Sequence, residues 1–159
     1  MIKAVGAVLI IICGAAFGLS KALALETRTA YLYDMAQFIS FLHTDLCYKQ
    51  SESATALKKA SYGLKRLPLD LSTLDSKSLA RCVEAAYERL PTEAKNEVFK
   101  TALLQYGTGE TQAQKKHLEY AQTLLKNEAD AANEKLAADK KLYGALGIFG
   151  GIVAAILLI

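Results

Sequence analysis

The distribution of charge along the chain constrains its fold more than any other feature. The sequence has 159 residues and a formal net charge of +3. All 16 acidic residues and 18 of the 19 basic ones lie between residues 20 and 141. The two charge-free ends read AVGAVLIIICGAAFGL over residues 4–19 and LYGALGIFGGIVAAILLI over residues 142–159. The chain therefore divides into a charged central region and two apolar ends.

Each apolar end is predicted to cross a membrane as a helix, since a bilayer span needs about 17–25 mostly apolar residues. The C-terminal run meets that length, and the N-terminal run meets it when Ser20 and the aliphatic stem of Lys3 are included. The alternative for the N-terminal run is a cleaved signal peptide, because residues 22–24 fit its small-residue cleavage pattern. The adjacent Lys21 favours an uncleaved span.

The predicted organisation is a span over residues 1–20, a helical region over 21–141 and a second span over 142–159. Cytoplasmic flanks of membrane helices are enriched in Lys and Arg. Among the basic residues, only Lys3 lies outside the central region. Six others lie within the central region and close to one of the two spans: Lys21, Arg28, Lys126, Lys135, Lys140 and Lys141. Residues 21–141 are therefore expected in the cytoplasm. Three scattered cysteines without a CxxC motif fit that reducing compartment.

The central region is predicted to be an all-α bundle. No glycine or proline occurs between Leu19 and Tyr62, so the first helix is expected to run on from the N-terminal span to about Tyr48. Its apolar residues follow a 3-4 spacing that is typical of a helix packed against a partner: Leu32, Met35, Ile39, Leu42 and Leu46.

Three shorter helices are expected to follow. One spans about residues 53–66 and ends before Pro68. The next takes Asp75 as its N-cap. The third opens at Pro91, with Val98 among its inward positions, and ends at Gly107 as a left-handed C-cap.

The last helix is expected to begin at Thr111, because Thr111 and Gln114 match the T-x-x-Q capping box. No proline interrupts the chain after it, so this helix should continue into the C-terminal span. The first and last helices would then be antiparallel neighbours, with the three short helices beside them.

Both predicted spans carry glycines at a small-xxx-small spacing, which lets helix backbones approach closely in lipid. These glycines are Gly14, Gly18, Gly147 and Gly151. They are predicted to pack the two spans. The alternative is that glycine is simply common in membrane helices.

No group of residues indicates an enzyme, a metal site or a cofactor. His43 and Cys47 share a helix face, but a structural zinc needs four ligands and the sequence offers no second pair. Gly107 and Gly109 form a motif too short for a phosphate-binding loop. The charge of +3 is too small and too dispersed to favour nucleic acid binding.

Four segments of the chain resemble one known family. Residues 103–118 read LLQYGTGETQAQKKHL and residues 142–151 read LYGALGIFGG, with weaker likeness at residues 3–10 and 42–48. The family is stage III sporulation protein AB of endospore-forming Firmicutes. Its pattern carries over to Gly107, Gly109, Gln114 and His117 as candidate interaction or turn residues, although its second turn glycine is displaced to Gly109.

The resemblance implies a non-enzymatic membrane platform, similar to the cytoplasmic domain of the type II secretion inner-membrane platform protein. Such a protein would lie in the mother cell membrane facing the forespore, within the channel complex that joins the two cells. Its implied partners are other stage III sporulation channel proteins, including a secretion-type ATPase. Because the platform protein has two copies of this domain and the chain has one, a homo-oligomer is expected.

Two other functions share part of this physical basis. A generic membrane-anchored helical scaffold or cell-division adaptor would have the same spans and bundle, without the turn from Gly107 to His117. A small membrane enzyme or metal protein would need a set of reactive or ligating side chains that the sequence does not display.

Overall fold

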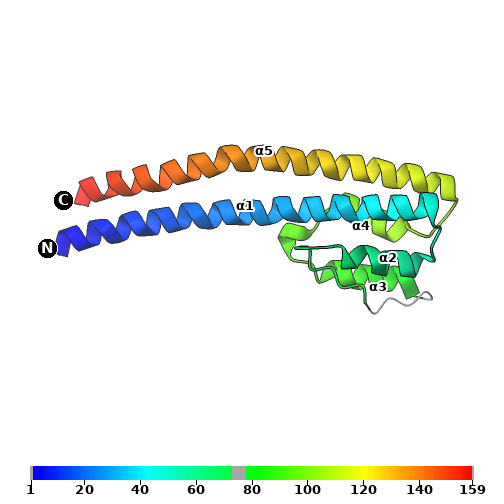
Figure 1. Ribbon diagram of the computed structural model, residues 1–159. Coiled ribbons are helices and arrows are strands. Elements are labelled where there is room, and N and C mark those ends of the chain that lie inside the picture. The colour runs from blue at the N-terminus through cyan, green and yellow to red at the C-terminus, as the bar shows by residue number, and fades with distance from the viewer. Residues whose placement is uncertain (1, 73–77, 159) are drawn as a thin grey trace. The chain divides into compact units, whose positions relative to one another are not determined.

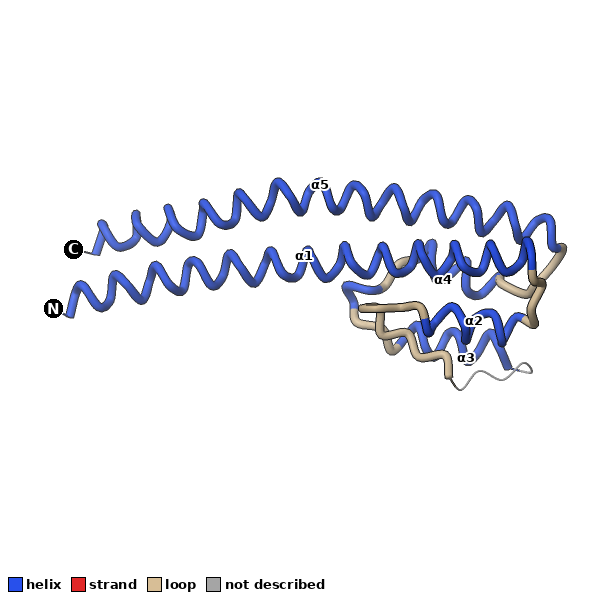
Figure 2. The backbone as a smooth tube through the Cα atoms, viewed as in Figure 1, coloured by secondary structure: helices blue, strands red, loops and turns tan. Residues whose placement is uncertain are grey.

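The computed structural model describes residues 2–72 and 78–158, and over much of 2–19 and 143–158 the description covers the backbone alone (Figure 1). The elements are helices and loops, and no strand occurs in the described ranges (Figure 2). The predicted all-α class is confirmed. The elements are α1 (Ile2–Tyr48), α2 (Ser53–Tyr62), α3 (Leu79–Glu88), the 3-10 turn η2 (Thr92–Ala94), α4 (Glu97–Gln105) and α5 (Thr111–Leu158).

The chain forms two compact units. The central unit covers residues 30–130, and the terminal unit combines residues 1–29 with residues 131–159. Helices α1 and α5 each contribute to both units, so the predictions of one long helix at each end of the chain are confirmed. At about 1.5 Å per residue, each of these helices is about 70 Å long.

The core of the central unit is built on the 3-4 spacing of α1. Leu32, Met35, Ile39 and Leu42 are buried, and Leu46 is half-buried. The partners on α5 are small or branched, and they include the buried residues Leu118, Ala121, Leu125 and Ala129. Phe38 of α1 meets Phe99 of α4 edge to face, with ring centroids 5.6 Å apart.

Helix α1 ends at Tyr48, where Asp45 satisfies the backbone that follows. The carbonyl of Asp45 accepts hydrogen bonds from the N–H groups of Lys49 and Gln50, both at 2.8 Å. Its carboxylate accepts from the N–H of Ser51 at 3.1 Å and from the Ser51 hydroxyl at 2.9 Å. Gln50 adopts a φ of 50°, which turns the chain sharply toward α2.

Helix α2 ends earlier than predicted because of a second carboxylate of α1, that of Asp34. Oδ2 of Asp34 accepts hydrogen bonds from the N–H groups of Lys65, Arg66 and Leu67 at 3.2, 2.6 and 2.8 Å. Those three N–H groups are therefore not used in a helix, and α2 ends at Tyr62 instead of continuing to residue 66. Asp34 itself is 7% exposed.

Of the two other short helices, α4 starts later than the sequence indicates, and the predicted start of α3 lies outside the described residues. Helix α3 begins at Leu79, and its predicted cap, Asp75, lies outside the described residues. Helix α4 begins at Glu97 and not at Pro91, because the Asn96 side chain caps it by accepting from the N–H groups of Val98 and Phe99. In place of the expected first turn, the chain forms η2.

In the terminal unit, the first part of α1 and the last part of α5 run antiparallel (Figure 1). The Lys140 ammonium donates to Glu26 at 2.8 Å. Both side chains are solvated, so this ion pair contributes at most about 1 kcal/mol. Over the described residues, no helix is long and apolar enough to cross a membrane. The surroundings of Gly14, Gly18, Gly147 and Gly151 lie outside what the structure describes.

Replacing Asp34 tests whether its carboxylate holds the segment after α2. We expect Asp34→Ala to lower the free energy of unfolding by about 2–4 kcal/mol, because the substitution leaves three N–H groups without their charged acceptor. The measurement is urea unfolding of the full chain in detergent. Glu84→Ala, at an exposed position of α3, is the control and should change stability by less than about 0.5 kcal/mol. Equal losses for the two variants would contradict this role of Asp34.

Candidate functional site

The turn between α4 and α5, residues 106–110, holds most of the residues that the sequence singled out. Gly107 and Gly109 both have a φ of +83°, a conformation that residues with a Cβ rarely adopt. The predicted left-handed conformation of Gly107 is therefore confirmed. The two glycines differ in their surroundings: a Cβ on Gly107 would lie 2.5 Å from the Ser53 Oγ, whereas a Cβ on Gly109 would meet nothing within 4 Å.

Gln114 closes this turn from the first helical turns of α5. Its Nε2 donates to the carbonyls of Thr108 at 2.7 Å and Gly109 at 3.1 Å, and its Oε1 accepts from the Gly107 N–H at 3.3 Å. The predicted capping box between Thr111 and Gln114 is wrong, because the Gln114 side chain bonds to residues 107–109 of the loop instead of to Thr111. The Gln114 side chain thereby joins the backbone of three consecutive loop residues, Gly107, Thr108 and Gly109.

A cavity of about 140 Å³ lies between the turn and the start of α5. Its lining includes Tyr106, Glu110, Gln114 and His117. His117 is half-buried, and its Nε2 is buried with no hydrogen-bond partner among the described atoms. The structure therefore brings Gly107, Gly109, Gln114 and His117 together, with Gln114 holding the turn and His117 among the residues that line the cavity.

Tyr106 forms the buried wall of the same turn. It is 3% exposed, and burial together with the nearby Asp45 carboxylate raises its pKa from 10.0 to about 12. Burial disfavours the phenolate, and the negative charge of Asp45 disfavours it further. The turn is thus coupled electrostatically to the end of α1, where Asp45 holds the chain that leads into α2.

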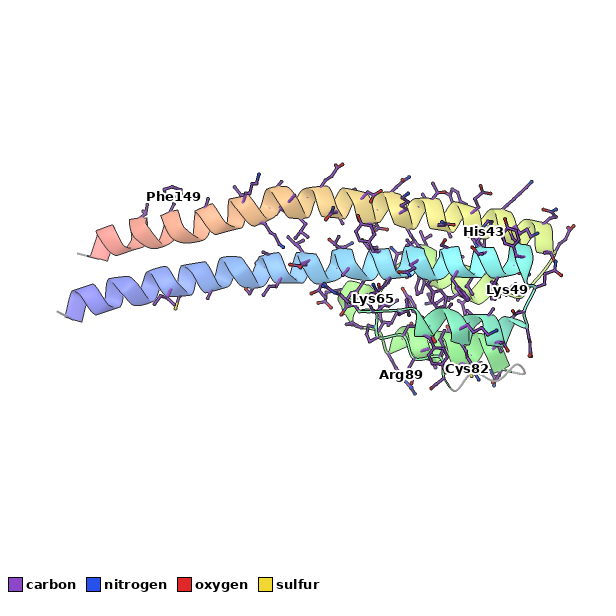
Figure 3. The ribbon with its side chains drawn as sticks, in the orientation of Figure 1. His43, Lys49, Lys65, Cys82, Arg89 and Phe149 are labelled. Atoms are coloured by element: carbon purple, nitrogen blue, oxygen red, sulfur yellow. The ribbon has the colours of Figure 1, made fainter. Side chains whose placement is uncertain are left out.

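His43 and Cys47 lie together as the sequence predicts, with Nε2 and Sγ 3.8 Å apart (His43 is labelled in Figure 3). A metal would need at least one further ligand, and within the described ranges no group of three His, Cys, Asp or Glu side chains is placed to bind one. The pair packs at the end of α1.

Sequence reasoning missed three polar residues that organise this unit: Asp34, Asp45 and Asn96. A signal for the first two exists. Between Thr29 and Tyr48, Asp34 and Asp45 are the only acidic or basic residues other than His43, and both fall on the apolar face of α1. An isolated carboxylate on a buried face requires donors nearby. Asn96 gave a weaker signal, because the preceding Pro91 offered a competing helix start.

The central unit defines an all-helical protein in which short helices pack against segments of two long ones through a glycine turn fixed by Gln114. The chain belongs to the stage III sporulation protein AB family, whose model matches residues 3–159. Membership of this family implies a role in sporulation, and it confirms the resemblance seen in the sequence. Comparisons with curated proteins and with solved structures find no match.

The two turn glycines offer a matched test of the close approach at Ser53. We expect Gly109→Ala to lower the free energy of unfolding by about 1–2 kcal/mol through backbone strain alone. Gly107→Ala should cost about 1–3 kcal/mol more, because its Cβ also collides with the Ser53 side chain. Adding Ser53→Gly to Gly107→Ala should recover that extra cost, measured as a double-mutant cycle. Identical losses for the two glycines would show that the approach to Ser53 does not matter.

The raised pKa of Tyr106 predicts a loss of stability in alkaline solution. Below pH 10 the phenol is protonated in both the folded and the unfolded chain. Between pH 10 and about 12 only the unfolded chain ionises, so the folded state loses stability, by about 1 kcal/mol at pH 11. Denaturant unfolding at pH 8 and pH 11 should show this loss in the wild type relative to Tyr106→Phe. Tyr48→Phe, at a position 84% exposed, is the control and should track the wild type. A constant difference between wild type and Tyr106→Phe would contradict the shift.

Proposed function

We propose that this chain is a non-enzymatic platform component of the membrane channel complex that joins mother cell and forespore. The observation that supports the proposal most directly is the family match over residues 3–159, which includes both apolar ends as well as the helical region. A protein of this family acts in sporulation, and a helical domain with apolar ends suits a component that organises others at a membrane.

The membrane part of the proposal rests on the sequence. Residues 4–19 and 142–159 are free of charge and long enough for two spans. The basic residues that flank them lie on the side of the central region, which favours a cytoplasmic location for residues 21–141. The protein would then lie in the mother cell membrane that faces the forespore.

The partner part of the proposal rests on the family. We infer that the chain forms a homo-oligomer and works with other stage III channel proteins, among them a secretion-type ATPase. The α4–α5 turn is the candidate surface for these contacts, because it combines a rigid backbone held by Gln114 with the cavity beside His117.

Deleting the gene in its host tests the proposed function. We expect the count of heat-resistant spores to fall by several powers of ten, with development arrested after engulfment, because the forespore would lose its connection to the mother cell. A plasmid copy of the wild type should restore the count. An unchanged count in the deletion strain would contradict the sporulation platform and would favour a generic membrane scaffold.

Variants of the turn separate a contact surface from a structural turn. If His117 contacts a partner, His117→Ala should fail to restore spores while its thermal stability stays unchanged. Gln114→Ala should lose stability, since it removes the bonds to the loop backbone. Gln112→Ala, at an exposed position in the first turn of α5, is the matched control and should behave as the wild type.

A further inference from the structure

The exposed face of α1 in the central unit carries no charged side chain. Between Thr29 and Tyr48 the only Asp, Glu, Lys or Arg residues are Asp34 and Asp45, which are 7% and 3% exposed. Both carboxylates accept hydrogen bonds from backbone N–H groups within the unit. In a chain with 22% charged residues, an uncharged outer face over four to five helical turns departs from the usual solvated helix.

Aromatic and small polar side chains occupy this outer face. With successive residues about 100° apart on a helix, the exposed positions fall within an arc of about 80°. We call them the α1 stripe: Tyr33, Gln37, Phe41, Thr44 and Tyr48. Tyr33, Phe41 and Tyr48 are 41%, 37% and 84% exposed. The face of α5 in the same unit contrasts with it, because Lys116, Glu119 and Lys126 are exposed there.

This composition is typical of a protein interface. The centres of interfaces are depleted of charged residues and enriched in tyrosine and phenylalanine. Water solvates aromatic rings poorly, so an exposed row of three is unfavourable unless another surface covers it.

We propose that the α1 stripe is where a second copy of this chain packs, with the two α1 helices parallel and in register. The inference rests on the membrane attachment proposed above. Two copies in one membrane are related by a two-fold axis along the membrane normal, which places each residue of the stripe opposite its own equivalent.

The stripe is suited to meeting itself. Two identical charged faces would repel each other, whereas the side chains of the stripe carry no charge. The Asp130 carboxylate of α5 accepts a hydrogen bond from the Tyr33 hydroxyl at 2.9 Å, at the end of the stripe away from Phe41. Phe41, near the middle of the stripe, would pack against Phe41 of the second copy. The Gln37 amide has both a donor and an acceptor, so it can hydrogen-bond to its own equivalent, whereas the Thr44 hydroxyl donates to the Ser40 carbonyl at 2.9 Å and keeps only its acceptor capacity.

The size of the stripe limits the strength of the contact. From Tyr33 to Tyr48 the helix rises about 22 Å, and a helix is about 10 Å wide. That footprint is well below the roughly 800 Å² per partner of a stable interface. The contact therefore needs the high effective concentration that a shared membrane provides.

Cross-linking in native membranes tests the proposal on the full chain. In a background where Cys13, Cys47 and Cys82 are replaced by serine, Thr44→Cys should give a disulfide-linked dimer on mild oxidation. Thr101→Cys, an exposed threonine of α4 outside the stripe, is the matched control and should stay monomeric. Adding Phe41→Lys should lower the cross-linked fraction about tenfold, equivalent to about 1.4 kcal/mol, whereas Tyr62→Lys at an 80% exposed position should not.

Four results would overturn the stripe as a self-contact. These are a monomeric Thr44→Cys chain, a dimer that forms only between Thr44→Cys and Gln37→Cys copies, a product that contains a different protein, and a dimer insensitive to Phe41→Lys. If one of these occurs in a chain that sediments with membranes and still supports spores, the proposed function stands and the stripe contact fails. A chain absent from the membrane fraction would overturn the membrane attachment itself.

Discussion

A carboxylate removed from water needs hydrogen-bond donors, and Asp34 finds them in the backbone of a segment more than thirty residues away. Its Oδ2 accepts from three consecutive N–H groups, and this arrangement decides where α2 stops and where the chain turns toward α3. Asp45 does the same at the end of α1, where it holds the connection into α2. The short helices of the central unit thus depend on two charges placed on the buried face of one long helix.

The long helices follow from local properties of the sequence, which explains why they could be predicted. The absence of glycine and proline between Leu19 and Tyr62 and the 3-4 spacing of Leu32 to Leu42 specify α1 without knowledge of its partners. The ends of α2 and α4 depend on contacts that sequence does not display. Residues 64–66 contain no strong helix breaker, and the distant Asp34 carboxylate accepts the N–H groups of Lys65, Arg66 and Leu67 in place of helical carbonyls. Asn96 caps α4 in competition with Pro91.

The α4–α5 turn shows the same limit at the candidate site. Gly107 and Gly109 look equivalent in the sequence and share a φ of +83°, yet only Gly107 lies against the Ser53 side chain. A family resemblance, which carries no geometry, singled out both Gln114 and His117, and the capping-box pattern that also pointed to Gln114 gave it the wrong partners. The structure assigns them different surroundings: the Gln114 amide bonds to the loop backbone, whereas His117 lines a cavity and its buried Nε2 has no partner among the described atoms. A shared motif can therefore contain residues that differ in what they do.

The two faces of α1 are linked by a single constraint on charge. A helix of this length in water would normally gain solubility from Lys and Glu on its outer side. Here the carboxylates between Thr29 and Tyr48 lie inside, where backbone donors compensate their burial, and the outer side keeps tyrosine, phenylalanine, glutamine and threonine. Burying the two carboxylates of the inner face costs free energy, and backbone N–H groups of the same chain compensate that cost. The outer face is costly to leave in water, and nothing within the central unit's described residues covers Phe41 or Tyr48 fully. A self-contact centred on Phe41 would remove that cost, because the side chains of α1 around Phe41 carry no charge that the second copy would repel.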